Sequence, residues 1–183
     1  MNRTSLRRKR PFAFLVFLGV FVLSSAWALS MPLAAGPDEP AHIIKAASVV
    51  RGELLGEPTN DPAVTRVQVP APLADANEWH CFAYEPSISA ACQQPPSAEV
   101  GERSALTSAG LYNPSYYLLV GWSTLLEQGP IVMVMGMRIL TALLSAVLLA
   151  SVFSVMSRMM SSLAALTVLA VAATPMVFFL NAI

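Results

Sequence analysis

The stretch PFAFLVFLGVFVLSSAWALSMPL, residues 11–33, contains no charged side chain and is nearly all apolar. The hydrocarbon core of a bilayer takes about 20 helical residues, so this run is long enough to cross a membrane. The stretch AAGPDEPAHIIKAASVVRG, residues 34–52, follows at once and brings an acidic pair, a histidine and a lysine. The abrupt change predicts a membrane helix that ends near residue 33 and a polar region outside the bilayer.

The composition supports a membrane protein. Of the 183 residues, 55% are hydrophobic and 12% are charged, whereas a soluble domain carries about 25% charged residues. Five of the eleven basic residues precede residue 11, and ten of the eleven acidic residues lie between Asp38 and Glu102. By the positive-inside rule, the basic tail stays in the cytoplasm and the acidic segment is exported. Because the basic cluster is a short tail beside an apolar run, the sequence argues against nucleic-acid binding.

Two further apolar runs, on either side of Arg158, predict two more membrane helices. The expected fold class is therefore an all-α, multi-pass protein of the plasma (inner) membrane, with three transmembrane helices and an extracytoplasmic loop that contains short helices. The expected parts are a basic tail at 1–11, a first transmembrane helix at 12–33, the exported loop at 34–112, an interfacial helix at 113–129, and transmembrane helices at 130–157 and 159–183. The alternative for the first helix is a signal peptide cleaved after Ala26-Trp27-Ala28.

The exported loop contains nine prolines, and these favour loops and short helices over a sheet. Just after this loop, Pro114 can begin a helix that Gly129-Pro130 would end. That segment is too short to cross a bilayer comfortably, and its Tyr and Trp residues are typical of the membrane interface. We therefore expect it to lie on or dip into the outer leaflet. The alternative is that it extends the next crossing.

The two cysteines, Cys81 and Cys92, both lie in the exported loop. Exported compartments are oxidising, so we expect these residues to form a disulfide. A metal site that adds His80 to the two thiols is an alternative, but it lacks a clear fourth ligand. Two free thiols are the third reading.

The segment from Pro37 or Asp38 to Gly52 predicts a helix, on which Asp38, His42 and Lys45 share one narrow face. In a structural interpretation, Asp38 caps the helix, Glu39 favours its dipole, and the other two side chains face water. In a functional interpretation, Asp38 or Glu39 is a general base. A third option is that Asp38 and His42 hold a divalent cation, although two ligands are a weak metal signal.

The motif GPDEPAH, directly after the first span, resembles the hallmark of a bacterial family of multi-pass membrane proteins classed as a domain of unknown function. That family is similar in layout to the GT-C glycosyltransferases, which use sugars linked to polyprenyl phosphate. The resemblance implies an acidic residue in the first extracytoplasmic loop that acts as a base or helps to hold a metal. It makes Asp38 and Glu39 the catalytic candidates, with His42 and Lys45 in support.

Two later segments extend the resemblance. YNPSYYLL resembles the Pro-rich, Tyr-containing segment before the second span, although Ser115 stands where a second proline is common. MRILTALLSAVL resembles the opening of the next span, which makes Arg138 a candidate ligand for the phosphate of a lipid carrier. The alternative for Arg138, an ionisable residue within an apolar run, is that it reaches outward to lipid headgroups.

These observations predict the N-terminal part of a GT-C-like enzyme that moves a sugar from polyprenyl phosphate to a hydroxyl on the outer face of the membrane. Its partners would be membrane lipids and the lipid-linked sugar, and the sequence identifies no certain cofactor. Enzymes of this layout have many more spans, so a chain ending at FFLNAI is expected to be truncated. The alternatives are a non-catalytic membrane protein whose loop binds a cell-envelope partner, and an inactive remnant.

Overall fold

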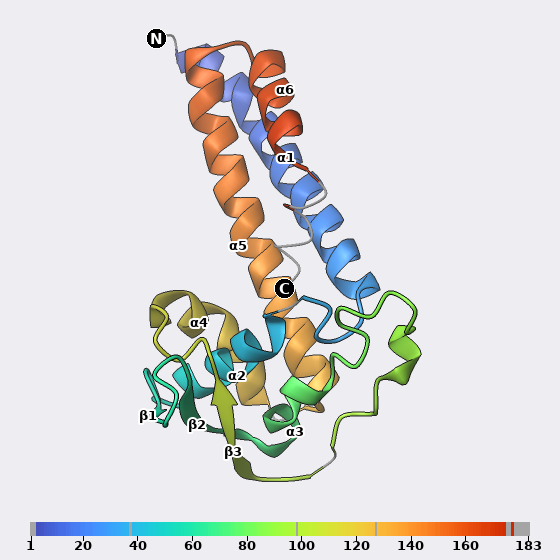
Figure 1. Ribbon diagram of the computed structural model, residues 1–183. Coiled ribbons are helices and arrows are strands. Elements are labelled where there is room, and N and C mark those ends of the chain that lie inside the picture. The colour runs from blue at the N-terminus through green and yellow to red at the C-terminus, as the bar shows by residue number, and fades with distance from the viewer. Residues whose placement is uncertain (1–2, 37, 98, 127, 175–176, 178–183) are drawn as a thin grey trace. The chain divides into compact units, whose positions relative to one another are not determined.

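The computed structural model describes residues 3–36, 38–97, 99–126, 128–174 and 177. The chain divides into two compact units. The helical unit consists of Met1–Ser30 and Ile139–Ala182, and the α/β unit consists of Met31–Arg138. The α-helices and strands are labelled in Figure 1.

The helical unit contains α1 (Arg3–Ser30), most of α5 (Pro130–Met159) and α6 (Ser162–Ala172). Two stretches are long and apolar enough to cross a membrane: Pro11–Ser30, with mean hydropathy 2.3, and Pro130–Met159, with mean hydropathy 2.4. Phe153, Ala165 and Leu169 form a small buried core in this unit. Most other large apolar side chains on α1 and α5 are exposed, which suits helices surrounded by lipid.

The third predicted span, 159–183, is not confirmed. Its described part contains α6, which has 11 residues, about half the length that a bilayer core requires. Pro175 follows in the sequence and disfavours helical backbone at Thr174, which precedes it. Residues 175–176 and 178–183 of this prediction lie outside the described residues.

The described residues are mostly helical, as predicted, but the α/β unit also contains a sheet, so the fold is not strictly all-α. The strands β1 (Glu57–Pro58), β2 (Thr65–Pro70) and β3 (Glu102–Thr107) form an antiparallel sheet in the order β1-β2-β3, with Val67 opposite Ala105. Side chains along β2 alternate between buried and exposed, as expected for a strand with one covered face. The prolines do not prevent pairing, because Pro58 lies on the short edge strand and Pro70 ends β2.

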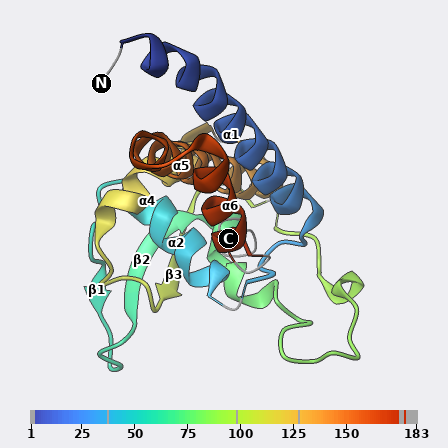
Figure 2. The same ribbon diagram turned by 90° about the horizontal axis from the view of Figure 1, so that it is seen from above.

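The centre of the α/β unit is α2 (Glu39–Val49), which packs against β2, β3 and α4 (Figure 2). Ten of its eleven residues are buried, so the expected amphipathic helix with a solvated polar face is instead a core helix. The remaining short helices are α3 (Ala71–Ala74), η1 (Ala76–Glu78), η2 (Ala90–Cys92), α4 (Pro114–Val120) and η3 (Gly121–Leu126).

The segment 113–129, expected as one interfacial helix, contains α4 and the tighter helix η3. Asn113 begins α4, because its side chain accepts a hydrogen bond from the amide of Ser115 at 3.0 Å. Gly121 lies where a Cβ atom would come within 2.3 Å of the Ala46 carbonyl oxygen, so only glycine allows this close approach to α2. The next helix, α5, begins separately at Pro130.

The predicted disulfide between Cys81 and Cys92 is confirmed, with the two Cα atoms 6.2 Å apart. Neither the metal site nor the pair of free thiols is present at these cysteines. The bond fixes the loop next to Gln93, whose Nε2 donates to the carbonyl oxygens of Leu33 and Trp79, both at 2.7 Å. The disulfide loop is thereby attached to the beginning of the α/β unit.

Candidate functional site

A buried ion pair joins the first turn of α2 to α5. Arg138 Nε lies 2.7 Å from Glu39 Oε1, and Arg138 Nη2 lies 2.9 Å from Glu39 Oε2. The same guanidinium donates to the carbonyl oxygens of Met31 at 2.9 Å and Pro32 at 2.7 Å. The α/β unit begins at Met31 and ends at Arg138, so these contacts tie its first residues to its last.

Both side chains of this pair are 2% exposed. The fork of guanidinium donors matches the two carboxylate oxygens, which is the strong, directional form of such a contact. Glu39 and Arg138 therefore have a structural role at the start of α2. Rather than reaching outward to lipid headgroups, the guanidinium of Arg138 is turned to protein acceptors. The roles predicted for Glu39 as a base and for Arg138 as a phosphate ligand stay predictions.

Asp38 is exposed and occupies the N-cap position of α2. Its backbone carbonyl accepts a hydrogen bond from the His42 amide at 3.2 Å, but its side chain makes no capping hydrogen bond. Asp38 is thus the N-cap residue, as one interpretation predicted, but its carboxylate makes no capping hydrogen bond. The two acidic neighbours differ in kind: the carboxylate of Glu39 is buried against Arg138, and that of Asp38 is open to solvent.

His42 lies one turn further along α2, against a cluster of tyrosines. Its Nδ1 is 2.7 Å from the hydroxyl of Tyr117, and the two rings are nearly parallel with centroids 5.8 Å apart. Tyr112 lies 5.9 Å from the imidazole, and Tyr116 packs edge-on against Tyr117 at 5.3 Å. These tyrosines lie far from His42 in the chain, so local sequence patterns do not connect them with it.

Burial sets the protonation states in this cluster. It lowers the pKa of His42, and the nearby carboxylates of Asp38 and Glu39 oppose that shift. Burial also raises the pKa of Tyr117 to about 12, with smaller contributions from Tyr116 and Tyr112. At neutral pH the hydrogen bond therefore joins a neutral imidazole to a protonated phenol, and it fixes α4 to α2.

Lys45 is fully buried, and the expectation that it faces water was wrong. Its ammonium group donates to the backbone carbonyl oxygens of Leu54 and Gly110. Burial lowers the pKa of Lys45, because the interior disfavours its charge. Along the predicted polar face, exposure thus decreases from Asp38 through His42 to Lys45.

Residues 21–182 match the model of a family described as a predicted membrane protein, DUF2142. The chain belongs to the DUF2142 family. No curated protein and no solved structure matches the chain. Membership agrees with the two long apolar helices, and the matched range includes Asp38, Glu39, His42 and Arg138.

The DUF2142 chain offers little to a metal ion in the part that the structure describes. Among those residues, no group of three or more His, Cys, Asp or Glu side chains is placed to hold one. Of the two predicted ligands, His42 already uses Nδ1 with Tyr117. One carboxylate and the remaining ring nitrogen make a weak donor set for a divalent cation.

Proposed function

We propose that this DUF2142 chain is the N-terminal part of a GT-C-like membrane glycosyltransferase. It transfers a sugar from a polyprenyl-phosphate carrier to a hydroxyl acceptor on the outer face of the plasma membrane. The observation that carries the proposal is the contrast between Asp38 and Glu39. Asp38 is an exposed carboxylate without a capping bond, placed beside a buried ion pair just after the membrane helix α1.

In the proposed reaction, Asp38 takes the proton of the acceptor hydroxyl. The acceptor oxygen forms a bond to the anomeric carbon of the sugar, and the bond from that carbon to the carrier phosphate breaks. Polyprenyl phosphate leaves with the bonding electrons. A general base must come within hydrogen-bond distance of the proton that it removes. A solvent-exposed carboxylate can do so without first breaking a contact with the protein.

The other residues of the cluster act in this proposal by positioning α2. Arg138 holds Glu39 through both carboxylate oxygens, and His42 is held by Tyr117. Glu39 and His42 lie within about one turn of Asp38. Their contacts with Arg138 and Tyr117 therefore fix the orientation of the first turn of α2, which carries Asp38. In this proposal Arg138 positions α2 through Glu39, and its predicted role as a ligand of the carrier phosphate stays a prediction.

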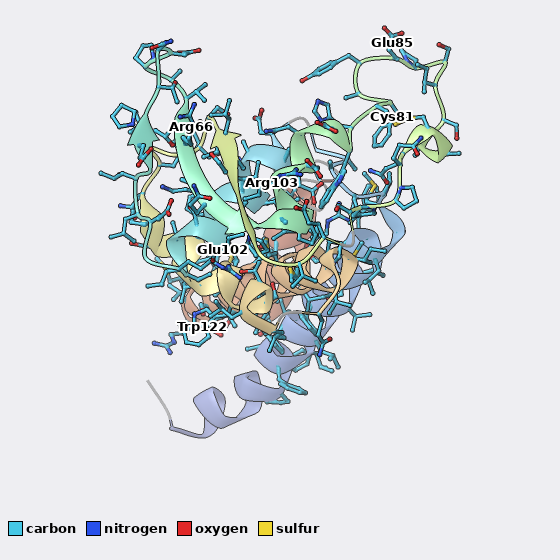
Figure 3. The ribbon with its side chains drawn as sticks, turned by 90° about the horizontal axis from the view of Figure 1, so that it is seen from below. Arg66, Cys81, Glu85, Glu102, Arg103 and Trp122 are labelled. Atoms are coloured by element: carbon cyan, nitrogen blue, oxygen red, sulfur yellow. A yellow bond between two sulfur atoms is a disulfide. The ribbon has the colours of Figure 1, made fainter. Side chains whose placement is uncertain are left out.

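The test is transfer of radiolabelled sugar from polyprenyl phosphate to envelope acceptors, in membranes that contain the complete gene product. Asp38→Asn should lower the rate about 100-fold to 10,000-fold, the usual contribution of a general base, while abundance stays at the wild-type level. Asparagine is as good an N-cap residue as aspartate. Glu85→Gln, which changes an exposed carboxylate in the disulfide loop (Figure 3), is the matched control and should keep full activity.

If Asp38→Asn transfers sugar at the wild-type rate, Asp38 is not the general base. Absence of transfer by the wild type with every lipid-linked sugar supplied would favour a non-catalytic membrane protein whose loop binds an envelope partner.

A further inference from the structure

The end of α4 and the whole of η3 carry an apolar outer face. The exposed side chains of this face, here called the apolar stripe, are Leu118 (49%), Leu119 (54%), Trp122 (61%), Leu125 (42%) and Leu126 (62%). Their spacing of three and four residues places them on one side of a helix. No charged residue occurs between positions 111 and 126.

The inner face of the same segment contains Val120 and Gly121, and it also holds the segment's buried polar side chains. Ser123 donates to the Met133 carbonyl at 2.8 Å, and the hydroxyl of Thr124 accepts a hydrogen bond from Arg51 at 2.8 Å. Tyr117 is buried and bonded to His42. A helix at a water surface has its polar side chains outside and its leucines inside. This segment has the reverse arrangement, which is typical of a helix that faces lipid.

Contacts within the α/β unit relate the stripe to the membrane. The membrane helix α1 ends at Ser30, and Arg138 binds the carbonyl oxygens of the next two residues. Glu39, the partner of Arg138, is one turn of α2 away from His42, which holds α4 through Tyr117. The segment that carries the stripe is therefore attached to α2 one helical turn from Glu39, whose partner Arg138 binds the residues that follow α1 in the sequence.

We propose that the apolar stripe inserts into the membrane leaflet next to the α/β unit, so that α4 and η3 form an interfacial anchor besides the spanning helices. The occupant of this surface is lipid. The chain belongs to a membrane protein family, and Trp and Tyr side chains are enriched where acyl chains meet headgroups. The inference does not depend on the proposed transferase activity.

Trp122 gives a direct test, because it lies in the stripe. Figure 3 shows it on the opposite side of the α/β unit from the loop that holds Cys81 and Glu85. The full chain is placed in phosphatidylcholine vesicles with bromine on one acyl chain near the headgroup. The difference in emission between wild type and Trp122→Phe isolates Trp122 without disturbing the buried residues. The brominated lipid should quench most of the Trp122 fluorescence obtained in this way, and aqueous iodide should quench little of it.

The two other tryptophans are internal controls. Trp27 lies in α1 and is 39% exposed, so the signal lost in Trp27→Phe should also be quenched by brominated lipid. Trp79 is 3% exposed in the α/β unit, and its signal should respond to neither quencher. Strong quenching of Trp122 by iodide would show that the stripe faces water. Protection from both quenchers would show that protein covers it, either a second copy or another segment. Each of these two results would overturn the proposal.

Discussion

Arg138 reaches across 99 residues of sequence to bind both carboxylate oxygens of Glu39. Both side chains are 2% exposed, so water solvates neither charge. Taking one partner from a buried ion pair leaves the remaining charge without a counterion, which costs about 3–5 kcal/mol. This pair, between the first residues of α2 and the last residue of the α/β unit, underlies the first prediction.

Glu39→Gln should lower the free energy of unfolding of the α/β unit by about 3–5 kcal/mol. The measurement is chemical unfolding in detergent, followed by the fluorescence of the buried Trp79. Asp38→Asn is the matched control, because it makes the same chemical change one residue earlier at an exposed position. It should change stability by less than about 0.5 kcal/mol.

The double variant Glu39→Leu with Arg138→Met should recover much of this loss, since an apolar pair often replaces a buried ion pair at little cost. Equal stability of Glu39→Gln and wild type would refute a structural role for the pair. If Glu39→Gln proves inactive in transfer assays, its stability must be known before Glu39 is assigned a chemical role.

Stability should also decrease as the pH falls below 6.5, because of His42. The pKa of His42 in the folded protein lies below its ordinary value of 6.5. Above that pH the imidazole is neutral in both states, and folding changes no proton binding there. As the pH falls through 6.5 the unfolded chain binds a proton before the folded chain does, so the free energy of unfolding decreases.

His42→Gln should remove this part of the pH dependence, because glutamine does not titrate. The measurement is the unfolding midpoint of both proteins over about pH 5 to 8. The difference between the two curves isolates His42. Parallel curves for the two proteins would mean that His42 is not the group responsible.

Lys45→Met should destabilise the α/β unit although methionine fits an apolar interior. The substitution removes the donor for the carbonyl oxygens of Leu54 and Gly110, and a buried polar group left unpaired costs about 1–3 kcal/mol. Arg66→Met removes a cation from an exposed position on β2 and should be nearly neutral. Thermal unfolding of the two variants compares them, and a Lys45→Met protein as stable as Arg66→Met would contradict the role of the ammonium group.

The proposed topology predicts different labelling of Ser5→Cys and Ala63→Cys in intact cells. Because the basic residues precede the first span, Ser5→Cys should be protected from a membrane-impermeant maleimide. Ala63 is exposed in the α/β unit, and a cysteine there should react. The native cysteines form a disulfide and need not be removed. Labelling of Ser5→Cys alone would invert the topology and would place Asp38 in the cytoplasm.

Sequence patterns predicted the features of this fold that depend on local chemistry. The apolar runs predicted α1 and the apolar length of α5, and Pro114 predicted the beginning of α4. The sequence prediction lacks the sheet, because the prolines of the exported loop favour loops and short helices over strands. The alternation of Thr65, Val67 and Val69 is a strand signal, and it was available in the sequence.

The partners within the site could not be predicted in the same way, because they lie far apart in the chain. His42 meets Tyr117 across 75 residues, and Lys45 meets Gly110 across 65. One signal for Arg138 was available: an arginine in an apolar run needs an acceptor, and Glu39 follows the neighbouring span. Helical spacing places Lys45 on the face of Asp38 but cannot show that this face turns inward.

The ion pair between Glu39 and Arg138 also has a consequence for biosynthesis. Ribosomes add about 5–20 residues per second, so the 99 residues that separate the two side chains take roughly 5–20 seconds to synthesise. During that interval Glu39 is already part of the nascent chain, and its counterion Arg138 has not yet been added. The α/β unit can therefore close only after the beginning of α5 has been synthesised, and chaperones and proteases have those seconds in which to act on the nascent chain.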